Sequence, residues 1–154
     1  MKRRLWHSAL VLLASLFIAS SVGAGELEDK LIQSAQRGDI KDVQTLLDKG
    51  ANINMPDSYK RTALMRASDR GHANVVRLLI DRGANINARD NLGGTALMLA
   101  CMSGKTEVVR VLIDKGADVN VRETGFLLYS ALDYAKESKN SEIIRMLKAA
   151  GAKE

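Results

Sequence analysis

The chain holds few residues of the types that carry out catalysis. From residue 25 onward, the sequence contains one histidine, His72, and one cysteine, Cys101. Nucleophilic or acid–base catalysis needs several reactive groups that converge on one point, and a zinc site needs Cys and His residues grouped at short spacings. No phosphate-binding glycine loop is present either, and Gly93-Gly94 predicts a hairpin tip instead. We therefore expect no enzyme activity, no metal site and no cofactor.

The single cysteine leaves two interpretations open. Cys101 has no second cysteine with which to form a disulfide inside the chain. It can be a buried, inert thiol that packs like a small apolar side chain, or a thiol with a redox or ligand-binding role. We favour the buried thiol.

A short sequence recurs at a fixed spacing and sets the fold class. Gly-Ala-Asn-Ile-Asn at 50–54 returns at 83–87 and, as Gly-Ala-Asp-Val-Asn, at 116–120, each time after 33 residues. A second block, Thr-Ala-Leu-Met at 62–65, returns at 95–98 with the same offset. A period near 33 residues is typical of stacked-repeat proteins, whose units bury their apolar faces against one another.

Each repeat contains the signals for two helices. Thr62 and Thr95 suit the N-cap of an inner helix, because a hydroxyl accepts a hydrogen bond from the first turn. Gly71 and Gly104 are typical of the end of that helix. An outer helix is predicted by an apolar stripe, which in one repeat consists of Val75, Val76, Leu78 and Leu79. It ends at the glycine of the next recurring block, which is Gly50, Gly83 or Gly116.

These blocks closely resemble the ankyrin repeat. That family's pattern runs Thr-Pro-Leu-His-x-Ala, then Gly-His, then an apolar Val-Val-x-Leu-Leu helix, then Gly-Ala-Asp-Val-Asn, and the resemblance covers about residues 26–153. It implies an all-α solenoid of stacked helix–turn–helix units joined by β-hairpin-like loops, with protein binding as its function. We expect one domain over residues 25–154, with units at 26–49, 50–82, 83–115 and 116–152.

The sequence departs from the family pattern at two positions of the inner helix. Alanine stands in place of proline at residues 63, 96 and 131, and the motif histidine is replaced by Met65, Met98 and Asp133. We expect the family's polar Thr–His bonding inside each repeat to be missing or altered. His72 follows Gly71 as in the family's Gly-His turn, which favours a structural role in the turn or in helix capping.

Residues 1–24 do not belong to the repeats. Lys2, Arg3 and Arg4 precede an apolar stretch from Leu10 to Val22, and small residues end at Ala24. This order is typical of a secretory signal peptide with cleavage after Ala24. The alternative is an uncleaved anchor, which we disfavour because the stretch is short against the roughly 20 residues of a spanning helix.

The charge of the chain depends on that segment. The sequence has 23 basic and 18 acidic residues, and three of the basic ones lie in residues 1–24. The remaining chain carries 20 against 18, a net charge of about +2. Because no basic face with interleaved aromatic residues is present, we expect no nucleic-acid partner.

The resemblance implies that partners meet the hairpin loops and the exposed face of the inner helices. The third loop is the most distinctive, because the 33-residue spacing slips to 35 around four consecutive apolar or aromatic residues at 126–129. This cluster either binds a partner, with Phe126 and Tyr129 as anchors and Tyr59 as a secondary contact, or packs over the last repeat. The candidate contacts are Tyr59, Arg61, Arg66, Arg89, Asn91, Leu92, Phe126, Leu127, Leu128 and Tyr129.

The sequence therefore favours a non-catalytic protein-binding module that is exported to the bacterial periplasm, where it stabilises or regulates another protein. The alternative is a secreted, host-directed effector or toxin-like protein that uses the same surface. We expect a monomer that does not interact with membranes after cleavage.

Overall fold

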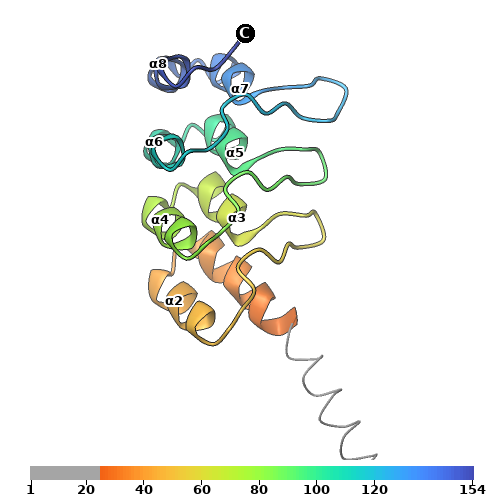
Figure 1. Ribbon diagram of the computed structural model, residues 1–154, viewed down its shortest axis with the longest axis vertical. Helices are drawn as coiled ribbons and strands as arrows, with labels where there is room; N and C mark the ends of the chain where they lie inside the picture. Colours follow the sequence, from red (N-terminus) through yellow and green to blue (C-terminus); the bar gives the residue numbers. More distant parts are fainter. Residues whose placement is uncertain (1–24) are drawn as a thin grey trace, which may run out of the picture.

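The computed structural model describes residues 25–154, which form an elongated stack of helix pairs (Figure 1). The predicted signal peptide lies outside the described residues. Hairpin loops project from one side of the stack, next to the row of inner helices α3, α5 and α7 (Figure 1). The described residues form eight helices: residues 25–37, α2 Ile40–Asp48, α3 Ala63–Arg70, α4 Ala73–Asp81, α5 Ala96–Met102, α6 Thr106–Asp114, α7 Ala131–Glu137 and α8 Ser141–Ala149.

The all-α solenoid that the sequence predicts is confirmed. Inner helix α5 packs between α3 and α7, and outer helix α6 packs between α4 and α8. Between residues 25 and 154, the only β-structure is an isolated antiparallel bridge that joins Arg122 and Ser130 at the base of the last hairpin. None of the helices in this range combines the length and the apolar character that crossing a membrane requires.

The inner helices begin at hydroxyl caps, as predicted. The backbone N–H of Met65 donates to the hydroxyl of Thr62, and that of Met98 donates to Thr95, both at 3.4 Å. The predicted change in polar bonding differs between repeats. Met65 and Met98 are buried in the core. Asp133, by contrast, forms a reciprocal capping box with Ser130, so the third repeat regains a polar bond at the start of its helix.

Alanines let the inner helices approach closely. Ala67, Ala100 and Ala135 hold the same position in α3, α5 and α7, and each has no exposed surface. The outer row adds larger apolar side chains that are also fully buried, such as Leu79 and Leu112. Fully burying a leucine stabilises a fold by about 1.5–3 kcal/mol. Because each unit buries these side chains against its neighbour, the stability of one unit depends on the next.

A row of asparagines, which we call the asparagine ladder, joins the repeats along the turns. The side-chain oxygens of Asn54 and Asn87 each accept a hydrogen bond from a backbone N–H of the following unit, at 2.8 and 3.0 Å. That of Asn120, in the last unit, accepts the N–H of Lys153 just after its final helix, at 2.8 Å. The amide of Asn54 also donates to the carbonyl of Gly83 in the following unit, and that of Asn120 donates to Gly151 in its own unit. The ladder therefore fixes the register of each repeat on the next.

In the first unit a carboxylate takes the place of an asparagine. Glu28 lies in the helix at residues 25–37 and is 7% exposed. Its Oε1 accepts the backbone N–H of Asn52 at 2.8 Å, the same type of bond that Asn54 accepts from Asn85. The first helix thus supplies the ladder contact for the first turn.

His72 has a structural role, but it does not cap its helix. It occupies the N-cap position of α4 without a side-chain capping bond. Instead its Nε2 lies 3.0 Å from the carbonyl oxygen of Gln36 in the preceding unit. The ring rests on Gly38, where a Cβ atom would come within 2.5 Å of the imidazole. The prediction of a structural histidine agrees with this contact, which joins two units rather than capping one helix.

The ladder can be tested at its centre. The substitution Asn87→Ala removes the acceptor for the N–H of Asp118, and we expect it to lower the free energy of unfolding by about 0.5–1.5 kcal/mol. Asn74→Ala is the matched control, because Asn74 is exposed on α4, and it should change stability by less than about 0.5 kcal/mol. Urea unfolding measures both. Equal stability of the two variants would show that the ladder contributes nothing.

The stacked core gives a second prediction with an internal control. Leu112→Ala removes a fully buried side chain of α6 and should cost about 2–5 kcal/mol. Leu92→Ala makes the same change at an exposed hairpin tip and should have an effect within about 0.5 kcal/mol. Thermal unfolding followed by circular dichroism compares the two. If Leu92→Ala lowered the stability as much as Leu112→Ala, the result would contradict the assigned core.

Candidate functional site

Each of the first two hairpins is built around one aspartate. Oδ1 of Asp57 accepts the backbone N–H groups of Tyr59 and Arg61, at 2.8 and 2.9 Å. Oδ1 of Asp90 accepts those of Leu92 and Gly94, both at 2.9 Å. With the carboxylate inside the turn, the side chains of Tyr59 and Leu92 point outward, and they are 64% and 60% exposed.

Neighbouring hairpins are hydrogen-bonded to one another. The backbone N–H of Asn91 donates to the carbonyl of Tyr59 at 3.2 Å, and that of Thr124 donates to Leu92 at 2.9 Å. The guanidinium of Arg89 donates to the carbonyl of Arg122 in the next hairpin. The three loops therefore form one connected row (Figure 1), which fixes the spacing of the side chains at their tips.

The third hairpin contains the insertion that the sequence indicates. Its base is closed by the N–H of Glu123, which donates to the carbonyl of Tyr129 at 2.9 Å. Five residues lie between these two, against three between Asp90 and Gly94 in the second hairpin. Leu128 adopts a positive φ of 51° to close the longer turn.

The apolar cluster of this hairpin divides into two parts. Phe126 is fully exposed (101%), and Leu127 and Leu128 are 63% and 51% exposed. Tyr129 instead turns toward the last repeat, where its ring meets that of Tyr134 edge to face, with centroids 5.3 Å apart. Of the two interpretations of the cluster, packing describes Tyr129, and the other three residues are free to contact a partner.

Each of the two tyrosine hydroxyls is bonded to a carboxylate where the third hairpin meets α7. The hydroxyl of Tyr129 donates to Glu137, and that of Tyr134 donates to Glu123, both at 2.7 Å. The bond to Glu137 and the charge of that carboxylate raise the pKa of Tyr129 above its usual value. Burial, together with the bond to Glu123, raises that of Tyr134 further. Both hydroxyls therefore remain protonated donors at neutral pH and anchor the base of the third hairpin.

Two of the predicted arginine contacts are engaged inside the molecule. Nε of Arg61 lies 3.3 Å from Oδ2 of Asp90, and Nε of Arg66 lies 3.1 Å from Oδ2 of Asp57. Burial alone would raise the pKa of Asp57, but hydrogen bonds from Arg66 and from the turn amides lower it. Arg61 and Arg66 are half-buried and support the hairpins, whereas Arg89 and Asn91 are exposed but joined to neighbouring loops.

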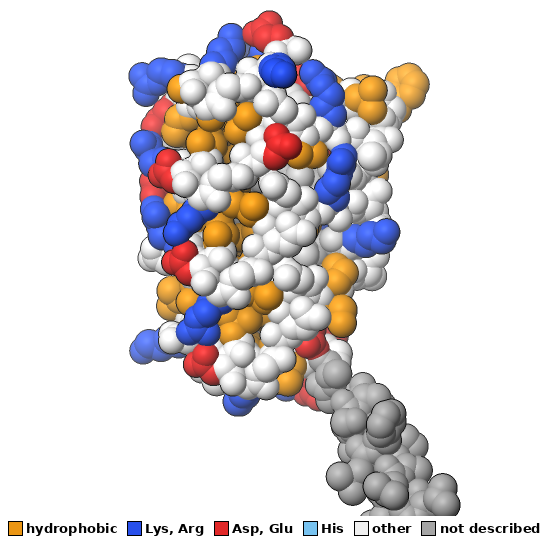
Figure 2. Space-filling view, in the orientation of Figure 1, with side chains coloured by type: hydrophobic (Ala, Val, Ile, Leu, Met, Phe, Trp, Pro, Cys, Tyr) orange, Lys and Arg blue, Asp and Glu red, His pale blue; other side chains and the backbone are white. Residues whose placement is uncertain are grey.

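The remaining predicted contacts are exposed apolar side chains at the tips of three adjacent hairpins, which we call the hairpin patch: Tyr59, Leu92, Phe126, Leu127 and Leu128. Hydrophobic side chains are visible at the tip of the uppermost hairpin in Figure 2. Beside the patch, Leu92 and the exposed Met102 rim a small hollow that Tyr134 also lines. Clusters of exposed apolar side chains of this kind are typical of interaction sites.

Within residues 25–154, this surface has neither a reactive thiol nor a cluster of metal ligands. Cys101 is fully buried in α5, and burial raises the pKa of its thiol to about 12, so the nucleophilic thiolate is not formed at neutral pH. This burial agrees with the interpretation of Cys101 as a packed, inert thiol. Residues 25–154 contain no group of three or more His, Cys, Asp or Glu side chains placed to hold a metal ion.

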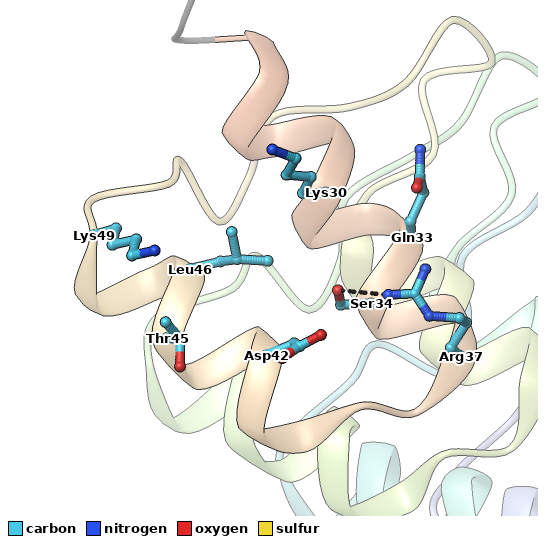
Figure 3. A pocket seen from close by; sticks show the side chains of 8 residues that line it. All are labelled: Lys30, Gln33, Ser34, Arg37, Asp42, Thr45, Leu46 and Lys49. Atoms are coloured by element: carbon cyan, nitrogen blue, oxygen red, sulfur yellow. Dashed lines mark hydrogen bonds between the residues drawn. The ribbon is translucent and has the colours of Figure 1, made fainter.

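A second hollow lies between the first helix and α2 (Figure 3). Its floor is Leu46, and the side chains of Lys30, Arg37 and Lys49 surround it. Two of these cations are already paired, Lys30 with Glu26 at 2.6 Å and Arg37 with Asp39 at 2.9 Å. A polar rim of this kind is expected at a terminal unit that faces solvent. The groups that line the hollow do not converge on one point.

Comparison with known proteins agrees with this architecture. A family model described as ankyrin repeats (3 copies) matches residues 31–123 and 90–153. No curated protein matches the chain. Ankyrin repeats are non-catalytic modules that generally mediate protein–protein interaction. The repeat spacing, the stacked helix pairs and the family match together show that the chain belongs to the ankyrin-repeat family.

Proposed function

We propose that this protein is a non-catalytic binding module that holds another protein on its hairpin patch. The single observation that carries the proposal is the exposure of Phe126, Leu127 and Leu128 at the tip of a hairpin whose base is fixed by hydrogen bonds. When a partner covers an exposed apolar tip, the free energy falls by about 25 cal/mol per Å² of apolar surface removed from water. Aromatic side chains such as phenylalanine bury about 150–250 Å² each.

The connected hairpins favour binding for a second reason. Ordering a loop during association costs free energy, and a surface that is already ordered avoids this cost. The bonds from Asn91 to Tyr59 and from Thr124 to Leu92 hold the tips at a fixed spacing before a partner arrives. The patch can therefore be recognised as a unit rather than as three separate loops.

We further propose that the protein is exported and acts in the periplasm, where it stabilises or regulates its partner. The basic start, the apolar stretch and the small residues before Gly25 support this location. A secreted effector that uses the same hairpin patch outside the cell is the second candidate. The same sequence features support export in both cases.

The binding proposal predicts different effects for Phe126 and Tyr129. Phe126→Ser removes an exposed anchor, so captured partner should fall by about tenfold, while the melting temperature changes by less than about 2 °C. Tyr129→Phe removes the bond to Glu137, so it should lower the melting temperature and leave capture unchanged. The measurement is affinity capture from an envelope extract, quantified by mass spectrometry, together with thermal unfolding.

The matched control is Ile40→Ser, which removes an exposed apolar side chain on α2, away from the hairpins. Its capture should equal that of the unchanged protein. If Phe126→Ser retains full capture, or if Ile40→Ser loses as much, the hairpin patch is not the binding surface.

Export can be followed through the single tryptophan. Trp6 is the only tryptophan of the sequence, so protein cleaved after Ala24 lacks tryptophan fluorescence. We expect no tryptophan emission and a mass that begins at Gly25 for protein recovered from its native compartment. Recovery from the periplasm supports the first candidate, and recovery from the medium supports the second. Full-length protein retained in the cytoplasm would contradict both.

A further inference from the structure

Exposed ion pairs join the outer helices at a repeated position. Asp48 at the end of α2 pairs with Arg82 after α4, with Oδ1 and Nη1 2.9 Å apart. One repeat later, Asp81 at the end of α4 pairs with Lys115 after α6, with Oδ1 and Nζ 2.7 Å apart. In both pairs the basic residue directly precedes the glycine that ends its outer helix. We call this series the outer ion-pair row.

The next member of the row is missing. Asp114 ends α6, one repeat after Asp81. The residue before the following glycine, Gly151, is Ala150 in place of an arginine or lysine. Among the described residues, Asp114 forms no salt bridge. Its carboxylate therefore lacks the cation that pairs with the corresponding aspartate in two other repeats.

The missing side chain leaves a groove between α6 and α8. Ile113 and Met146 are half-buried on its two sides, and the small residues Ala149 and Ala150 form one wall. Asp114 lies at its edge. The groove thus offers apolar surface for an aliphatic chain next to a free carboxylate.

Cations near this groove are engaged elsewhere. Arg110 also lines the groove, but its guanidinium contacts Glu142 at 3.0 Å and Glu107 at 3.5 Å. Lys148 on α8 contacts Glu154 at 3.1 Å. Neither neutralises Asp114, so charge complementarity favours a cation from outside these helices.

We propose that the groove between α6 and α8 accepts a lysine or arginine side chain of a partner protein. The methylene stem lies on Ile113 and Met146, as long basic side chains commonly do on apolar surface, and the charged head pairs with Asp114. This site lies on the outer helices, on the side of the stack away from the hairpins (Figure 1). It is independent of the hairpin patch and does not require the proposed function at that surface.

A single exposed ion pair contributes little binding free energy, so the groove adds selectivity rather than high affinity. Its contribution is the preference for a basic residue over a neutral one of similar length. The same preference makes the site salt-sensitive, because the ionic atmosphere screens exposed charges. Both properties can be measured without knowing the partner.

The probe is the peptide acetyl-Leu-Lys-Leu-amide at millimolar concentration, with acetyl-Leu-Gln-Leu-amide as its neutral counterpart. Amide shifts of the purified, ¹⁵N-labelled protein follow the titration. We expect saturable shifts within residues 110–114 and 146–151 for the lysine peptide, with affinity about two- to fivefold above the glutamine peptide. The difference should decrease as salt is raised.

Three variants complete the test. Asp114→Asn should abolish the preference for lysine, and Ala150→Lys should supply the missing cation and block the groove. Asp42→Asn removes one exposed carboxylate on α2 and should leave the titration unchanged. The proposal is overturned if the unchanged protein shows no lysine-dependent shifts at α6 and α8, or if those shifts persist in Asp114→Asn. Loss of partner capture in Phe126→Ser has no bearing on this result.

Discussion

Packing of each helix pair against the next holds the solenoid together. A single pair has too little apolar surface to fold alone, and the alanines at 67, 100 and 135 allow the inner helices to approach closely enough to share one core. Because every unit contacts only its neighbours, the register of the stack requires bonds between adjacent units. The asparagine ladder and the contact of His72 with Gln36 meet this requirement.

The same boundaries position the surfaces that partners can contact. On one side, each hairpin is bonded to the next, and the fixed row presents Tyr59, Leu92 and Phe126. On the other side, paired charges join the outer helices and alternate in sign along that edge (Figure 2). Residues at the repeated positions stabilise the stack. Departures from the repeat, such as the longer third hairpin and Ala150, leave exposed side chains or grooves that do not contribute to stacking.

Most of the fold could be predicted from the sequence because the repeat spacing is a local and strongly repeated signal. The caps at Thr62 and Thr95 and the burial of the apolar stripes follow directly from it. The direction of individual side chains at the tips could not be predicted. Tyr129 lies three residues after Phe126 in the sequence, yet its partners Tyr134 and Glu137 lie on α7. Arg61 and Arg66 are likewise engaged by Asp90 and Asp57, which depends on how the hairpins fold back on the inner helices.

The proposed function depends on a partner that binds at the hairpin tips. Binding there can be followed in cells with a photo-crosslinking amino acid at residue 126 and, in a parallel sample, at residue 77 on the exposed face of α4. We expect one discrete crosslinked protein from position 126 and none from position 77. A crosslinked partner obtained from position 77 but not from position 126 would contradict this expectation.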